Sequence, residues 1–165
     1  NFEGGILAAK TLQKNGCQKI IMISGNDNSD SPTGLRQLGF SYHLKKQAEV
    51  IRIPRDLSTI RREMQLKSAL TKYQPDGVFA SDDLTAMVLI KVAEQLGLSI
   101  PQDLKIIGYD GTQFIQDYYP RLTTIKQPIK EIAELCVEVL LKKMAKEKTA
   151  KDYVLPITLH AGSSS

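Results

Sequence analysis

Short apolar runs alternate along this chain with longer amphipathic segments, and this alternation limits the possible folds more than any other feature. The run 19–24 is apolar almost without interruption, which is typical of a strand buried on both faces of a parallel sheet. Similar runs predict strands at 49–53, 77–80, 104–108 and 122–126. The amphipathic segments predict helices at 3–15, from Pro32, from Ser58 to about Tyr73, at 83–96 and from Pro128 to about Lys146. Alternating strands and helices form a parallel sheet with helices on both faces. We therefore predict an α/β fold, a three-layer αβα parallel sheet.

Two local patterns add detail to this prediction. Leu35, Leu38 and Tyr42 recur at helical spacing, so we expect them on the buried side of the helix that Pro32 opens. Apolar and polar residues alternate over 153–159, which predicts a half-exposed final strand.

Composition excludes several classes of protein. The 165 residues are 42% hydrophobic, as in a soluble globular domain, and no apolar run reaches the length of a membrane span. The net charge of +4 is spread among acidic neighbours, and no helix-turn-helix motif is visible. Cys17 and Cys136 are expected to be free thiols in a reducing cytoplasm, and the two isolated histidines do not predict a metal site. The absence of a strand before the first helix and of an initial Met leads us to expect N-terminal sequence beyond Asn1.

Polar segments follow the predicted strands at 25–31, 54–57, 81–83 and 109–114. In open α/β sheets, ligands bind at the carboxyl ends of the strands, so these segments are expected to form one rim. Arg36 lies about one turn into the next helix and can point back to this rim. Carboxylates such as Asp82 and Asp110 accept hydrogen bonds from adjacent hydroxyls, and a guanidinium donates to others. The sequence therefore predicts a site for a polyhydroxylated ligand, with Leu57, Tyr109 or Phe114 available for its apolar faces.

Each of these residues also has a purely structural interpretation. Asp82 can serve only as a helix N-cap, Asp110 only as a turn residue before Gly111, and Arg36 only as the partner of a surface acid. An enzyme could instead use clustered acids to hold Mg²⁺ or to cleave glycosidic bonds, as a phosphatase or a glycosidase. The sequence contains no phosphate-binding loop, no GxSxG motif and no His beside a candidate nucleophile. We therefore expect no catalytic residue, no metal and no cofactor.

The helix 83–96 is apolar over more than one face, so one surface remains after it packs on the sheet. An isologous dimer would cover that surface, and a fully covered helix within one subunit is the alternative. The helix 129–144 has the same apolar surplus, which predicts packing on a subdomain that this chain does not contain.

Motifs in a fixed order resemble the regulatory core of the LacI/GalR family of transcriptional repressors, which is related in fold to periplasmic sugar-binding proteins. The resemblance covers nearly the whole chain. It lies in Gly4–Ala8, Gly16–Ile23, Arg36–Phe40, Pro75–Leu84, Ile100–Leu104, and most specifically Ile107–Asp110 and Leu122–Pro128. The stretch 108–114 further resembles the sucrose-operon repressors of Gram-positive bacteria.

This resemblance implies a periplasmic-binding-protein-like (type I) core of two subdomains with a sugar between them. Residues 1–126 would form the C-terminal subdomain, 127–152 a crossover and helix of the N-terminal subdomain, and 153–165 the return strand and tail. The implied ligand contacts are Arg36, Asp82, Asp110, Gln127, Leu57 and Ile129, although Leu57 and Ile129 stand where the family often has aromatic residues. Gly34 replaces a frequent Arg, and the loop 26–31 differs in length.

The implied partners are a small sugar effector, a second copy of the chain and operator DNA, which would be bound through a headpiece that this chain lacks. The implied homodimer surface includes Leu84, Met87, Val88 and Lys91. A cytoplasmic protein with no membrane contact is expected. An exported sugar receptor of similar fold is the alternative.

Overall fold

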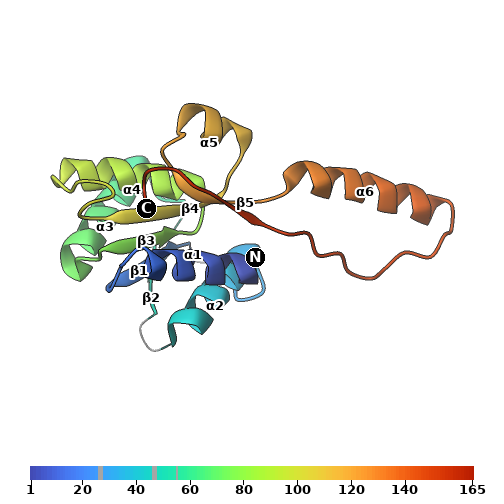
Figure 1. Ribbon diagram of the computed structural model, residues 1–165, viewed down its shortest axis with the longest axis horizontal. Helices are drawn as coiled ribbons and strands as arrows, with labels where there is room; N and C mark the ends of the chain where they lie inside the picture. The colour runs from blue at the N-terminus through green and yellow to red at the C-terminus, as the bar shows by residue number, and fades with distance from the viewer. Residues whose placement is uncertain (26–27, 46–47, 55) are drawn as a thin grey trace.

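The computed structural model describes residues 1–25, 28–45, 48–54 and 56–165, which form one sheet with helices on both faces (Figure 1). Residues 26–27 of the first predicted rim segment and Arg55 of the second lie outside these ranges. The elements, in chain order, are α1 (Phe2–Lys14), β1 (Ile20–Ser24), α2 (Pro32–Leu44), β2 (Glu49–Arg52), α3 (Thr59–Tyr73), β3 (Gly77–Ala80), α4 (Asp83–Gln95), β4 (Lys105–Asp110), α5 (Gln113–Tyr118), β5 (Thr123–Lys126), α6 (Ile129–Met144) and β6 (Thr158–His160).

The sheet has the strand order β2-β1-β3-β4-β5-β6. Strands β1 to β5 are parallel, and β6 pairs antiparallel with β5. The first five strands therefore end at the same edge, which brings the segments after them together. The predicted parallel α/β sheet is confirmed.

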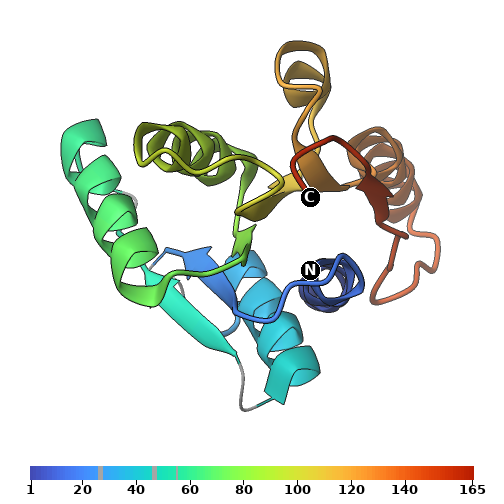
Figure 2. The same ribbon diagram turned by 60° about the vertical axis from the view of Figure 1, so that its left-hand side comes forward.

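The two faces of this sheet are covered by helices, as the view in Figure 2 shows, and an apolar core lies on each face. Helices α3 and α4 cover one face, where Leu66 and Leu89 are fully buried. Helices α1 and α2 cover the other, where Leu12 and Phe40 are fully buried. The three-layer αβα arrangement agrees with the sequence-based prediction.

Helices α1 and α2 pack closely through glycines. A Cβ atom at Gly5 would meet the backbone of Arg36 and Phe40, and one at Gly39 would meet the carbonyl group of Phe2. The buried face of α2 therefore contains small residues together with Arg36 and Phe40. The predicted inner stripe was wrong: Leu35, Leu38 and Tyr42 are 37%, 46% and 70% exposed, and the buried face instead carries Phe40 and Leu44 beside the glycines that allow close helix packing.

Two segments near the C-terminal half differ from the sequence-based prediction. The predicted strand 153–159 is only Thr158–His160, because β5 ends at Lys126 opposite Thr158 and offers no partner beyond that pair. The predicted rim segment 109–114 contains the start of the short helix α5, which Thr112 caps by accepting a hydrogen bond from the Ile115 amide at 3.4 Å.

Helix α6 extends away from the sheet, connected to it by β5 and by the returning chain (Figure 1). None of its residues is buried, although it carries several large apolar side chains. The polar tail, in contrast, is anchored: Ser164 is 1% exposed and its hydroxyl donates to the Ile106 carbonyl at 2.7 Å. In the described part of the chain, no helix has the length and apolar composition that crossing a bilayer requires.

Candidate functional site

Arg36 reaches the carboxyl edge of the sheet because of the way α2 begins. The Ser31 hydroxyl accepts a hydrogen bond from the Gly34 amide at 2.9 Å, and Pro32 occupies the first turn. Arg36 follows one turn later and is only 7% exposed. A guanidinium so deeply buried requires partners, because an unpaired buried charge is costly.

The guanidinium of Arg36 has three hydrogen-bond acceptors. Its Nη2 donates to Oδ1 of Asp110 at 3.3 Å and its Nη1 to the Ser81 carbonyl at 2.6 Å. Its Nε donates to Oδ1 of Asn1 at 3.0 Å. These contacts join α2 to the ends of β3 and β4 and to the start of the chain.

Asp110 is the last residue of β4, and its backbone has an unusual conformation. Its φ angle is 120°, a region that non-glycine residues rarely adopt and that often marks a functional position. Its carboxylate forms the ion pair with Arg36 and remains 33% exposed. The Asp110 side chain is therefore held by a buried cation and remains partly exposed to solvent.

Gln127 follows β5, the strand beside β4, and lies next to the same carboxylate. Its Nε2 donates to Oδ1 of Asp110 at 2.8 Å, and its backbone amide donates to the Asp110 carbonyl at 3.0 Å. The structure thus brings together Arg36, Asp110 and Gln127, three of the residues that the resemblance implied.

Asp82 lies beside this cluster and acts as the N-cap of α4. Its Oδ1 accepts a hydrogen bond from the Thr85 amide at 2.8 Å, and its Oδ2 accepts one from the Ser81 hydroxyl at 3.1 Å. The capping interpretation of Asp82 is confirmed. A ligand contact by this half-buried residue stays a prediction.

Of the other two predicted ligand residues, Leu57 lies apart from this cluster, whereas Ile129 follows Gln127 by two residues. Leu57 packs against the core beneath α3 and α4, whereas the aromatic ring next to Arg36 belongs to the core on the opposite face. Ile129, at the start of α6, is 51% exposed and, like Gln127, lines a hollow beside α5. Their ligand contacts remain predictions.

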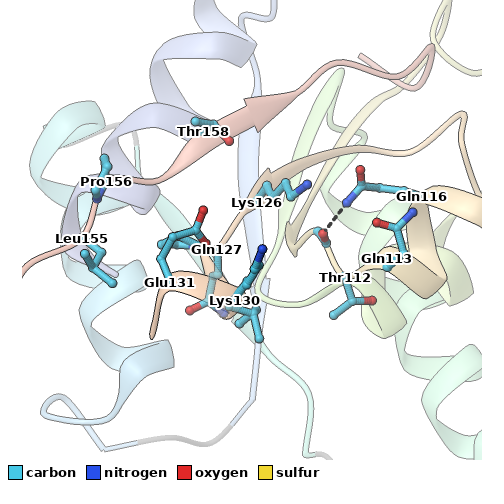
Figure 3. A pocket seen from close by; sticks show the side chains of 13 residues that line it. Thr112, Gln113, Gln116, Lys126, Gln127, Lys130, Glu131, Leu155, Pro156 and Thr158 are labelled. Atoms are coloured by element: carbon cyan, nitrogen blue, oxygen red, sulfur yellow. Dashed lines mark hydrogen bonds between the residues drawn. The ribbon is translucent and has the colours of Figure 1, made fainter. Parts of the chain in front are cut away.

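Two cavities lie at the base of α6, and Gln127 and Pro128 line both of them. The hollow in Figure 3 has a volume of about 770 Å³ and includes Thr112, Gln116, Lys126 and Glu131. The second, of about 850 Å³, is bordered by Asn1, Leu35, Tyr109 and Gln127 on the sheet side, and by apolar residues of α6 and the returning chain. Both volumes are in the range of small-molecule sites.

Sequence reasoning missed the role of Asn1 and misjudged Tyr109. The Tyr109 ring is fully buried, with the Arg36 guanidinium 3.7 Å from its centroid, so it supports the arginine. Its hydroxyl is buried without a hydrogen-bond partner among the described residues, and burial raises the pKa of the phenol. Phe114, the other aromatic candidate, is exposed on α5 and stacks with Tyr118.

Asp83, directly behind the cluster, was predicted only as part of a rim segment. The residue is 3% exposed. Its Oδ2 accepts a hydrogen bond from the Gly111 amide at 2.8 Å, and its Oδ1 accepts one from the Thr124 hydroxyl at 2.6 Å. Burial raises the pKa of this carboxyl to about 6, and the carboxylates of Asp110 and Asp82 oppose its ionisation further.

This raised pKa predicts how stability depends on pH. At neutral pH the folded protein holds the buried Asp83 carboxylate in its ionised form, which lowers the free energy of unfolding. This loss of stability is absent below about pH 4 and complete above about pH 6. Asp83→Asn should therefore raise the free energy of unfolding at pH 7.5 by about 2 kcal/mol, less than the shift itself implies because an amide forms weaker hydrogen bonds. The gain should vanish as the pH falls to 4. Urea unfolding at several pH values measures it, and an equal loss of stability at every pH would contradict the prediction.

The described residues contain no group of three or more His, Cys, Asp or Glu side chains arranged to hold a metal ion. The cluster instead offers carboxylate oxygens as acceptors, and amide and guanidinium groups as donors. Such groups form hydrogen bonds with hydroxyl-rich organic molecules.

Comparison with known proteins agrees with this fold. Residues 9–165 match the family described as periplasmic binding protein-like domain. The chain belongs to this family. Among curated proteins, it is 57% identical to the sucrose operon repressor of Streptococcus mutans over 164 residues, 99% of this chain and 51% of the relative. It is 43% identical to the sucrose operon repressor of Lactococcus lactis over 98% of this chain and 51% of that relative. The chain thus spans about half the length of these relatives.

Solved structures of similar fold include two regulators crystallised with sugars. A periplasmic binding protein/LacI transcriptional regulator from Alkaliphilus metalliredigens, complexed with D-xylulofuranose, is 29% identical with a TM-score of 0.84, over 99% of this chain and 63% of that one. A LacI family transcriptional regulator from Enterococcus faecium with bound ribose is 29% identical with a TM-score of 0.81, over 98% of this chain and 63% of that one. The predicted resemblance to the effector-binding core of LacI-type repressors, and to the sucrose-operon branch in particular, is confirmed.

Proposed function

We propose that this chain is the sugar-sensing part of a transcriptional repressor that controls a carbohydrate-utilisation operon. The sucrose operon repressors to which it is similar support this function, as do the regulators of similar fold that bind ribose and D-xylulofuranose. The chain would bind a small sugar, sucrose or a component of it, and catalyse no reaction. Operator DNA would be bound by a headpiece outside these residues.

The observation that carries this proposal is the ion pair between the buried Arg36 and the partly exposed Asp110, next to Gln127, which lines both cavities. Arg36 is fixed by three acceptors, while Asp110 remains one-third exposed. A carboxylate fixed in this way can accept hydrogen bonds from two neighbouring hydroxyls without first reorganising. Gln127 adds an amide at the same place, and Asp82 adds a second carboxylate one residue beyond Ser81. This combination suits a sugar.

The apolar surface of α6 supports the proposed division of the chain. Helix α6 exposes the apolar side chains of Ile132, Leu140 and Met144, and such a surface requires a partner that covers it. We assign residues 1–126 to the C-terminal subdomain, 127–152 to the N-terminal subdomain and 153–165 to the return strand and tail. The sugar would then lie between the two subdomains, beside Gln127 and Ile129 where the chain crosses.

A sugar that contacts both subdomains would favour one of their relative orientations. The change in operator affinity would equal the difference in sugar affinity between the two states, because a ligand shifts an equilibrium only by its differential binding. The Arg36–Asp110 pair would remain intact in both states, because all of its partners except Gln127 belong to the C-terminal subdomain.

Isothermal titration calorimetry on the complete gene product tests the proposal. The ligands are sucrose, glucose, fructose, ribose and their phosphate esters. Saturable binding of at least one of them is expected, with a matching change in the affinity for operator DNA. No binding to any member of the panel would refute the proposed function.

The two rival functions predict different observations. An exported sugar receptor would have an export signal in the sequence before Asn1, whereas a cytoplasmic repressor would have a helix-turn-helix headpiece there. A phosphatase or glycosidase would turn over chromogenic phosphate esters or glycosides. The named relatives, which are repressors, favour the cytoplasmic regulator.

The proposed regulator would act as a homodimer through the outer surface of α3 and α4. Leu84 is 64% exposed, and Met87 and Val88 are partly exposed on the same helix. Ile60 and Met64 of α3 extend the apolar surface. Lys91, at the edge, forms an ion pair with Glu63 of α3 at 2.7 Å within the chain. Removal of these apolar groups from water would stabilise a dimer.

We predict that Leu84→Glu weakens this dimer. A glutamate on each copy would bury two charges at the symmetric contact, so the dimer dissociation constant should rise at least tenfold. Leu38→Glu is the matched control, because Leu38 is also an exposed leucine but lies on α2, on the other face of the sheet. Sedimentation velocity at several concentrations measures the effect. Equal dissociation of the two variants would place the interface elsewhere.

A further inference from the structure

Asp83 satisfies both of its carboxylate oxygens inside the protein. One oxygen accepts from Gly111 and the other from Thr124, and the residue is almost inaccessible to solvent. Its role must therefore be exerted through the groups that it holds.

The amide that Asp83 holds belongs to the peptide group between Asp110 and Gly111. The carbonyl of that same peptide group accepts a hydrogen bond from the Gln127 amide at 3.0 Å. Both ends of one peptide plane are thus fixed, by α4 on one side and by the residue after β5 on the other. This plane sets the direction in which the Asp110 side chain leaves the backbone.

The backbone at Asp110 needs such support. Its φ angle of 120° is unfavourable for a residue with a Cβ atom and persists only where the surroundings impose it. The neighbouring sequence also leaves room for Asp83. A Cβ atom at Gly108 would collide with Oδ1 of Asp83, and Gly108 is paired in the sheet with Thr124, the second partner of that carboxylate.

We propose that Asp83 is a positioning residue of the effector site, which clamps the Asp110–Gly111 peptide so that the Asp110 carboxylate faces Arg36 and the sugar. This role rests on the proposed function of sugar binding. Asp83 raises effector affinity without touching the effector. The cost of burying its ionised carboxylate is consistent with this role, because residues retained for function often reduce stability.

Three variants of the complete gene product test this role. Asp83→Ala removes both hydrogen bonds, whereas Asp83→Asn keeps an acceptor for Gly111 and a polar partner for Thr124. Asp76→Ala is the matched control, because Asp76 also accepts two backbone amides, those of Gln18 and Lys19 at 2.7 and 2.8 Å, but just before β3, at the opposite edge of the sheet.

Hydrogen exchange measured by mass spectrometry gives a readout that needs no sugar. The peptide that contains Gly111 should exchange at least tenfold faster in Asp83→Ala and at nearly the wild-type rate in Asp83→Asn. In Asp76→Ala, faster exchange should be confined to the segment around Gln18. Unchanged exchange at Gly111 in a folded Asp83→Ala protein would overturn the proposal.

Calorimetry with the sugar that the wild-type protein binds gives the second readout. Asp83→Ala should weaken binding at least thirtyfold, Asp83→Asn less than fivefold, and Asp76→Ala not at all even where it lowers stability. Wild-type affinity in Asp83→Ala, or an equal loss in Asp76→Ala, would overturn the positioning role. If the wild-type protein binds no sugar of the panel, the proposed function fails, and the exchange data alone still decide whether Asp83 clamps the peptide.

Discussion

Replacing Asp110 by Ala should weaken sugar binding by about 3 kcal/mol, which is roughly a hundredfold in Kd. The variant removes the acceptor for the sugar hydroxyls and leaves Nη2 of Arg36 and Nε2 of Gln127 without their common partner. A buried donor that loses its acceptor also loses the compensation for its desolvation. Asp110→Asn, which keeps one oxygen, should lose less. Calorimetry on the complete gene product measures both variants.

The control for this prediction is Asp117→Ala. Asp117 is an exposed aspartate on the nearby helix α5, where it accepts a hydrogen bond from Gln113 at 2.8 Å. Its removal should leave the sugar Kd within a factor of two. A folded Asp110→Ala protein that binds sugar as tightly as the wild type would exclude Asp110 from the site.

Gly5→Ala is expected to lower the free energy of unfolding by about 3 kcal/mol, near the upper end for overpacking. The new methyl group would meet the backbone of Arg36 and Phe40, which cannot rotate away as a side chain can. Helices α1 and α2 would have to separate, and both Leu12 and Phe40 would lose contacts in the core. Urea unfolding followed by circular dichroism measures the loss.

Gly16→Ala is the matched control for this substitution. A methyl group at Gly16 meets nothing within 4 Å, but the φ angle of 87° disfavours any residue other than glycine. Its cost should therefore be only about 1 kcal/mol. If Gly5→Ala cost no more than this, the close contact of α1 and α2 would not limit stability.

The residues at the rim of the sheet show how much of the site can be predicted from sequence patterns. The predicted positions of the strand ends and turns placed Arg36, Asp82 and Asp110 at one edge, because parallel strands joined by helices all end on the same side. The pattern did not identify the buried face of α2. Large apolar residues normally mark such a face, but here glycines allow close helix packing, and Leu38 and Tyr42 point outward.

The partners of Arg36 lay beyond the reach of local patterns. Asn1, Ser81 and Asp110 are separated from it by 35, 45 and 74 residues. Tyr109 was one of three residues available for the apolar faces of a ligand, and it lies against the guanidinium. Asp83 was a rim residue by position, yet it points inward to Gly111.

The order of helices and strands, the parallel sheet and the edge at which polar residues gather are all predictable from the amino-acid sequence. These features follow from the periodicity of apolar residues and from capping and turn preferences, all of which act over a few neighbouring residues. Which side chains meet depends on contacts between distant parts of the chain. Adjacent residues such as Asp82 and Asp83, or Tyr109 and Asp110, point to different surroundings, and the strand order and the rotation of each packed helix select their partners.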